Sequence, residues 1–106
     1  KRNGDADKKI WVTEIGCPGV NERQKVNNWW LGKNPTEAQQ AKWLKNAFVH
    51  LLEDKSVEKI FWAFLRDCQG HWNNGIDYFG LVRWGFSTKP AFFAYRECFN
   101  NWKKNK

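Results

Sequence analysis

The chain has 106 residues, the usual size of one domain, and 42% of them are apolar, so a wholly disordered chain is excluded. Its longest apolar run, Ile60–Leu65, is far shorter than the roughly 18 residues of a membrane span, and we expect no membrane partner. Lys and Arg outnumber Asp and Glu by 18 to 11, but they are scattered and form no basic stripe, so we expect no nucleic-acid partner. Because the chain contains no methionine and begins Lys1-Arg2, we expect it to be a piece of a longer protein.

The first predicted element is a β-strand that follows a polar connector over residues 1–8. Ile10–Ile15 is rich in β-branched and aromatic residues, and Gly16 and Pro18-Gly19 end the pattern. Because this segment is apolar on both faces, we expect a buried parallel strand. Residues 16–34, rich in Asn, Gly and Trp, are predicted to form a long loop.

A helix is predicted next. Thr36 with Gln39 fits a capping box, and either Asn34 or Thr36 can serve as the N-cap. We expect the helix to end near Asp54-Lys55. Apolar residues at spacings of three and four mark its inner face: Ala41, Leu44, Ala47, Phe48, Leu51 and Leu52.

The second half of the chain repeats this order. Val57–Leu65 predicts a second buried strand, and a long loop follows over residues 67–88, in which residues 78–82 are expected to pair briefly. Lys89-Pro90 starts the last helix, because proline suits the first turn. The predicted apolar face of that helix consists of Phe92, Tyr95, Phe99 and Trp102.

Alternation of strands and helices implies parallel strands joined by crossover helices. Two such strands cannot close a core alone, and both long loops follow the C-terminal ends of strands, where (β/α)8 barrels place their chemistry. We therefore expect an α/β fold in which residues 1–106 form two βα units of a TIM (β/α)8 barrel, with one unit over residues 9–55 and the other over 56–106. The expected partner is the remainder of the barrel, either a second chain or copies of this one.

Two carboxylates lie where the predicted strands end. Glu14 is at the tip of the first strand and Asp67 just past the second. Glycoside hydrolysis typically uses two carboxylates, which makes this pair a candidate. For Asp67 we favour a loop-forming role or a partnership with Arg66. For Glu14 we favour a functional role, because Gly16 follows it at the tip of a buried strand.

Cysteines and histidines give no metal signature. Cys17, Cys68 and Cys98 are odd in number and none belongs to a CxxC motif, while His50 and His71 lack ligand spacing, so we expect no metal or other cofactor. A bridge between Cys17 and Cys68 is conceivable, since each follows a strand tip, but it is not implied. The cellular compartment stays open.

Eight tryptophans are the unusual feature of the composition. Tryptophan offers a large flat apolar face, which suits both a core and a sugar ring, and the two roles are equally expected at any one position. Four lie in predicted loops: Trp29, Trp30, Trp72 and Trp84.

The segment Ile10–Gly16, Ile-Trp-Val-Thr-Glu-Ile-Gly, resembles the strand-seven signature of the large clan of retaining (β/α)8 glycoside hydrolases that includes families 5 and 39. The resemblance runs from about residue 8 to residue 95 and implies that the strands are the seventh and eighth of the barrel. The downstream matches, in order, are Gln39–Leu44, Ile60-Phe61-Trp62, Arg66-Asp67, Tyr78–Val82 and Lys89–Phe92.

The resemblance implies that Glu14 is the catalytic nucleophile, which forms a glycosyl-enzyme. Trp62 matches an aromatic residue that often floors the sugar subsite, and His71 and Trp72 lie in the following loop, where substrate contacts are common. Asp67 matches a structural position, and Lys89–Ala91 matches a helix start without a catalytic role.

The predicted function is therefore cleavage of β-O-glycosidic bonds in oligo- or polysaccharides with retention. Many relatives carry a polar residue at the position of Ala63, so we expect an altered subsite. The acid/base glutamate of the clan comes from strand four, and nothing before Ile10 supplies it. Because each step needs both groups, we expect the isolated chain to be nearly inactive.

Two other functions stay open. One is a non-catalytic carbohydrate-binding domain that uses Trp29, Trp30, Trp62 and Trp72 as stacking platforms. The other is a basic module bound to nucleic acid, whose affinity should fall steeply with salt.

Overall fold

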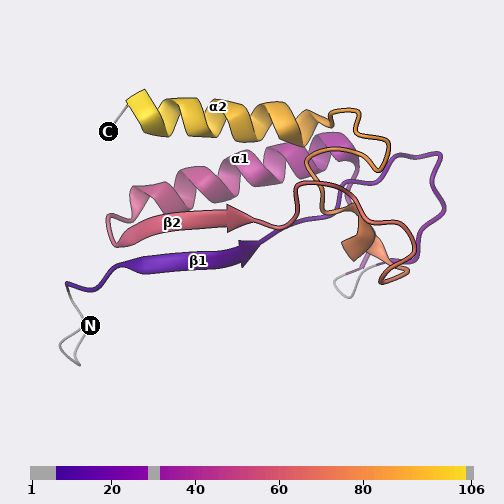
Figure 1. The fold of residues 1–106 in the computed structure, drawn as a ribbon, viewed down its shortest axis with the longest axis horizontal. Helices are drawn as coiled ribbons and strands as arrows, with labels where there is room; N and C mark the ends of the chain where they lie inside the picture. The colour runs from indigo at the N-terminus through magenta and orange to yellow at the C-terminus, as the bar shows by residue number, and fades with distance from the viewer. Residues whose placement is uncertain (1–6, 29–31, 105–106) are drawn as a thin grey trace.

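A computed structural model of the chain describes residues 7–28 and 32–104; Trp29 and Trp30, two of the loop tryptophans, lie outside the described residues. Two parallel strands and two helices alternate along the chain (Figure 1). The elements are β1 (Ile10–Ile15), α1 (Glu37–Glu53), β2 (Val57–Trp62), a 3-10 helix η1 (Gly75–Tyr78) and α2 (Pro90–Lys104). The predicted order of strand, helix, strand and helix is confirmed.

Helix α1 begins where the sequence predicts. Thr36 is the N-cap: its hydroxyl accepts a hydrogen bond from the Gln39 backbone N–H at 3.1 Å, and the Gln39 side chain accepts one from the Thr36 backbone N–H at 2.8 Å. This capping box satisfies two amide groups that a helix start otherwise leaves without partners. Asp54 caps the other end, as expected.

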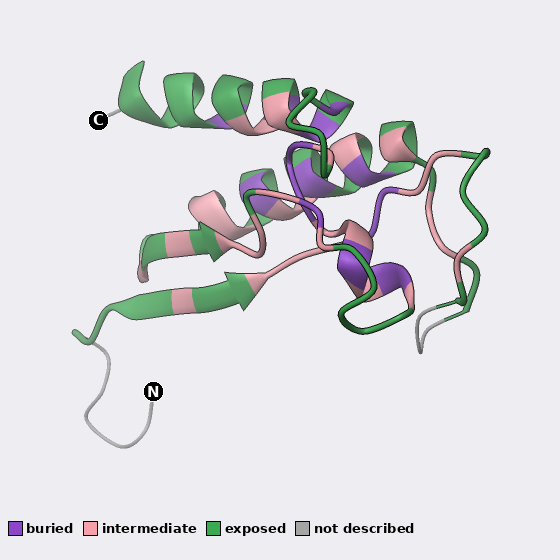
Figure 2. Ribbon diagram, turned by 45° about the vertical axis from the view of Figure 1, so that its right-hand side comes forward, coloured by how far each residue is buried: buried purple, intermediate pink, exposed green. Residues whose placement is uncertain are grey.

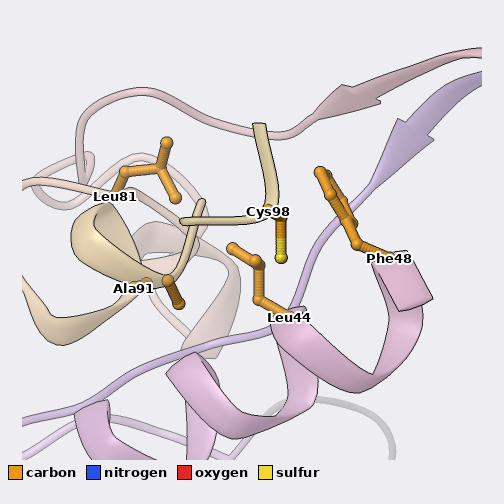
Figure 3. Close-up of a cluster of buried hydrophobic side chains, with 6 residues drawn as sticks. Leu44, Phe48, Leu81, Ala91 and Cys98 are labelled. Carbon is orange, nitrogen blue, oxygen red and sulfur yellow. The ribbon is translucent and has the colours of Figure 1, made fainter. Parts of the chain in front are cut away.

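The core lies between the two helices and the loop that precedes α2. Leu44 and Phe48 of α1 point toward Leu81, Ala91 and Cys98 (Figure 3). The predicted apolar face of α2 is therefore partly wrong. Its buried residues are Ala91, Ala94 and Cys98, while Phe99 and Trp102 remain exposed. Small side chains let α2 approach α1 closely, which leaves the larger ones at the margin of the contact.

Both strands are more exposed than their apolar sequences predict, and the expectation of buried strands is wrong for the described structure (Figure 2). Trp11 is 54% exposed and Phe61 is 50% exposed. The reason is that both helices pack on the same side of the two-stranded sheet, so no described element covers its other face (Figure 1). Parallel sheets are normally covered on both faces.

Strand β2 ends at Trp62, three residues earlier than predicted. The chain there changes partners: Ala63 N–H still donates to Ile15 O at 2.8 Å, whereas Leu65 O accepts from the N–H groups of Leu81 and Val82 at 2.9 and 3.0 Å. The brief pairing expected over residues 78–82 is confirmed at Val82, which forms bridges with Arg66 and Thr88. The short helix η1 was not predicted. Among the described helices, none combines the length and the apolar character that crossing a membrane requires.

Candidate functional site

The candidate site is built at the C-terminal end of the two strands, where the long loops gather (Figure 1). Val12 pairs with Ile60 and Ile15 pairs with Trp62, so three steps along β1 match two along β2. The extra residue in β1 produces a β-bulge between Val12 and Ile15, which contains Thr13 and Glu14. Bulges are frequent next to active sites, where they redirect a side chain.

Glu14 is exposed within this bulge. In the part of the chain that the structure describes, its carboxylate makes no hydrogen bond or ion pair. A carboxylate with such freedom at a strand end can meet an incoming ligand. The structure does not bring it together with a second free carboxylate among the residues described.

Gly16 lets the strand end pack tightly against the loop beyond β2. A Cβ atom at this position would lie 2.4 Å from the Phe79 ring and 2.5 Å from Ala63 O. Both distances are too short for carbon contacts, so any larger residue must push the loop away. The glycine two residues after Glu14 therefore serves the geometry of the site.

Gly16→Ala is expected to lower the free energy of unfolding by about 2 kcal/mol, because the added methyl group overpacks this contact. Gly85→Ala is the matched control, since no atom lies within 4 Å of a Cβ built there. It should change stability by less than about 0.5 kcal/mol. Urea unfolding of the two variants measures both values, and equal losses would contradict the packing role of Gly16.

A fully buried glutamine joins the loops beneath the strand ends. Gln40 of α1 donates from Nε2 to the carbonyl oxygens of Cys17 at 2.9 Å, Tyr78 at 3.3 Å and Gly80 at 3.2 Å. One amide thus holds the loop after Glu14 and the loop before α2 together. Sequence reasoning missed Gln40, although a signal existed: it lies four residues before Leu44 on the buried face of α1.

A buried ion pair supports the same loops. Lys89 Nζ lies 3.1 Å from Asp67 Oδ1 and 3.0 Å from Tyr78 O, and the Gly80 N–H donates to Asp67 Oδ1 at 2.8 Å. Burial raises the pKa of the Asp67 carboxyl and lowers the pKa of the Lys89 ammonium, and the opposite charge of the partner counteracts each shift.

The pair also corrects two expectations about Asp67: its partnership with Arg66 and its role as a catalytic carboxylate beside Glu14. The partner of Asp67 is Lys89, not Arg66, and its carboxylate is already engaged, so it does not form a catalytic pair with Glu14. Lys89, which the sequence marked only as a helix start, is fully buried.

Trp62 is held by packing on the helix-covered side of the sheet. Its Nε1–H donates to Phe79 O at 2.9 Å, and its ring meets Trp43 and Phe48 edge-on at centroid distances of 6.0 and 6.4 Å. Its pairing with Ile15 places Trp62 at the same end of the sheet as Glu14, with its ring on the side that α1 covers.

His71 and Trp72 do lie together. Trp72 stacks on Phe64 with the ring centroids 5.3 Å apart and the planes at 7°, and His71 meets its ring edge-on at 4.4 Å. Asp77, buried and missed by sequence reasoning, fixes the loop by accepting from the backbone N–H groups of His71, Trp72 and Asn73 at 2.9 to 3.2 Å. The result is a braced aromatic surface that stays partly exposed.

All three cysteines are free thiols, so the conceivable bridge between Cys17 and Cys68 does not form. Burial raises the pKa of the Cys17 thiol to about 11, although the charge of Lys89 opposes the shift. Within residues 7–28 and 32–104, no group of three or more His, Cys, Asp or Glu side chains could hold a metal ion.

The raised pKa of Cys17 predicts a loss of stability at high pH. Between pH 9 and pH 11 the unfolded thiol has released its proton while the folded thiol keeps it, so the folded state binds more protons and unfolding becomes more favourable as pH rises. Between pH 8 and 10.5, the wild type should lose about 2 kcal/mol more than Cys17→Ala. Urea unfolding at both pH values measures this difference, and parallel losses would show that Cys17 does not titrate so late.

The whole chain was compared with known proteins. No family model, no curated protein and no solved structure matches it.

Proposed function

We propose that the chain forms the seventh and eighth βα units of a TIM (β/α)8 barrel in a retaining glycoside hydrolase, with Glu14 as the catalytic nucleophile. The observation that carries the proposal is the position of Glu14: an exposed carboxylate, unpaired within residues 7–28 and 32–104, in a β-bulge at the C-terminal end of a parallel strand. This is the end at which barrel enzymes hold their catalytic groups.

The uncovered face of the sheet supports the proposal that this chain is one part of a larger barrel. Trp11 and Phe61 are apolar and half exposed, and among the described residues β2 pairs with β1 alone, which leaves its other edge free there. An apolar groove runs beside that edge, lined by Ile60, Phe61, Tyr95 and Phe99 among others. Further βα units would cover the sheet face, extend its edge and fill the groove, so we propose the remainder of the barrel as the partner.

In the proposed mechanism, the Glu14 carboxylate attacks the anomeric carbon of a β-glycoside. The bond to the leaving oxygen breaks, and an acid/base group from the remainder of the barrel protonates that oxygen. Water, deprotonated by the same group, then cleaves the glycosyl ester and restores Glu14. The two substitutions at the anomeric carbon give net retention.

The braced aromatic surface of Phe64 and Trp72 supports a sugar-binding role beside this chemistry. We propose that Trp72 and His71 contact the substrate, while Trp62 supports the strand end from the helix-covered side of the sheet. The same surface favours the second candidate function, a non-catalytic carbohydrate-binding domain, because stacking on Trp72 needs no catalytic carboxylate.

Native mass spectrometry tests the proposal first. A complex with a larger chain is expected, and it should hydrolyse aryl β-glycosides. A 2-deoxy-2-fluoro β-glycoside with a good leaving group should then attach covalently to the peptide that contains Glu14. A stable, folded monomer would contradict the barrel, and attachment at another carboxylate would contradict the role of Glu14. Sugar binding without hydrolysis would favour the non-catalytic domain.

A further inference from the structure

The hairpin between Val82 and Thr88 presents two aromatic rings that the proposed mechanism does not use. Trp84 is 49% exposed and Phe86 is 67% exposed. The guanidinium carbon of Arg66 lies 3.9 Å from the centroid of each ring. Arg66 also donates from Nε and Nη2 to the carbonyl oxygen of Trp84. One cation thus holds two rings that face solvent.

The hairpin is held by hydrogen bonds at both of its ends, which suits it to binding. Its ends pair through Val82 and Thr88, and the Arg83 N–H donates to Ser87 O at 2.8 Å. The Arg83 guanidinium donates to both carboxylate oxygens of Glu37, at 2.6 and 3.0 Å, and so ties the hairpin to the start of α1. A surface that is already ordered loses little conformational entropy when a ligand binds.

The charge of Arg66 has no counterion in the part of the chain that the structure describes. Within the described residues Arg66 makes no ion pair, because the carboxylates of the elements packed around it are bound elsewhere: Glu37 to Arg83 and Asp67 to Lys89. Its Nη1 group makes no hydrogen bond among those residues either. A free guanidinium edge can donate two parallel hydrogen bonds to the two oxygens of a carboxylate.

The location connects this cluster with the proposed site. Arg66 pairs with Val82 just beyond β2, at the end of the sheet that also carries Glu14 (Figure 1). The cluster offers an exposed indole and a guanidinium without an ion pair among the described residues. A ligand that has a flat ring and also carries a carboxylate can contact both. Among sugars, a uronate has these two features.

We propose that Arg66, Trp84 and Phe86 form a subsite for a uronate residue of an acidic polysaccharide. The identification of the ligand as a sugar rests on the proposed function. The uronate carboxylate binds the free Nη1 side of the Arg66 guanidinium, and the sugar ring packs against the exposed part of the Trp84 side chain beside it. The chain's net charge of +7 favours such an anionic ligand over a neutral one.

The test is an NMR titration of the full chain, followed through the Trp84 indole N–H signal. The probes are a β-1,4-linked glucuronate hexasaccharide, its neutral counterpart cellohexaose, and hexaglutamate. We expect the glucuronate to bind about tenfold more tightly than either other probe. Equal binding of cellohexaose would overturn the uronate assignment, equal binding of hexaglutamate would point to an acidic peptide instead, and no binding of the glucuronate would overturn the subsite.

Two variants locate the binding. Arg66→Gln and Trp84→Ala should each weaken glucuronate binding about tenfold, whereas Arg96→Gln should leave it unchanged. Arg96 is the matched control because it also lies over an aromatic ring, that of Phe93 at 5.1 Å, but on α2. Equal losses of glucuronate affinity in Arg66→Gln and Arg96→Gln would show that the net charge of the chain, not a subsite at Arg66, causes the binding.

Because Arg66 also braces the hairpin, Arg66→Lys provides a variant that keeps the charge. It should retain the preference for glucuronate over cellohexaose while losing the paired hydrogen bonds, and loss of that preference would count against the proposal. These measurements concern binding alone. Glucuronate can bind even if Glu14 has no catalytic role, and it can fail to bind even if the assembly hydrolyses glycosides. The uronate subsite and the catalytic role of Glu14 can therefore be disproved independently.

Discussion

Glu14→Ala in the completed assembly is expected to lower kcat for an aryl β-glycoside roughly 10⁴-fold, because no glycosyl-enzyme can form without the nucleophile. The side chain is exposed and makes no contact that stabilises the described structure, so its loss should leave folding intact. A chemical rescue distinguishes a nucleophile from a mere binding residue. Azide, placed where the carboxylate was, should restore turnover and give the α-glycosyl azide, since only one substitution then occurs.

Glu22→Ala is the control for this prediction. Glu22 is an exposed glutamate of the loop after β1, and its removal changes net charge by the same amount. Its kcat should stay within about twofold of the wild type. If Glu14→Ala keeps most of its activity, or if azide yields the β-glycosyl azide, another residue is the nucleophile and the proposed mechanism is wrong.

The secondary structure was predictable because local chemistry decides it here. Thr36 and Gln39 form a box that fixes the start of α1, and Pro90 fixes the start of α2, so both boundaries follow from the sequence. Burial was not predictable in the same way. The apolar residues of β1 and β2 predict two covered faces, but which face is covered depends on where the helices pack, and that is a tertiary property.

The candidate site, too, was predictable only in part. The position of Glu14 at a strand end follows from the sequence, because Gly16 and Pro18 interrupt the strand pattern at once. The support beneath the site does not. Gln40 acts through backbone carbonyl groups 23 to 40 residues away, and Asp77 acts through backbone N–H groups four to six residues away. Backbone partners leave no mark on residue type.

Lys89→Met is expected to lower the free energy of unfolding by about 3–5 kcal/mol, because it leaves the Asp67 carboxylate buried without its partner. Such a loss is a large part of the stability of a domain of this size. It should also loosen the carbonyl of Tyr78, which Lys89 shares with Gln40. The urea midpoint measures the change in each variant.

Two further variants test the cause. Asp67→Asn combined with Lys89→Met removes both charges and should be more stable than Lys89→Met alone by about 2 kcal/mol. Lys45→Met breaks the Lys45–Glu97 pair, which has nearly the same N–O distance, 3.2 Å against 3.1 Å, but is about half exposed on both sides. That variant should lose less than about 1 kcal/mol, because water replaces the partner. Similar losses for Lys45→Met and Lys89→Met would mean that burial does not govern the strength of these pairs.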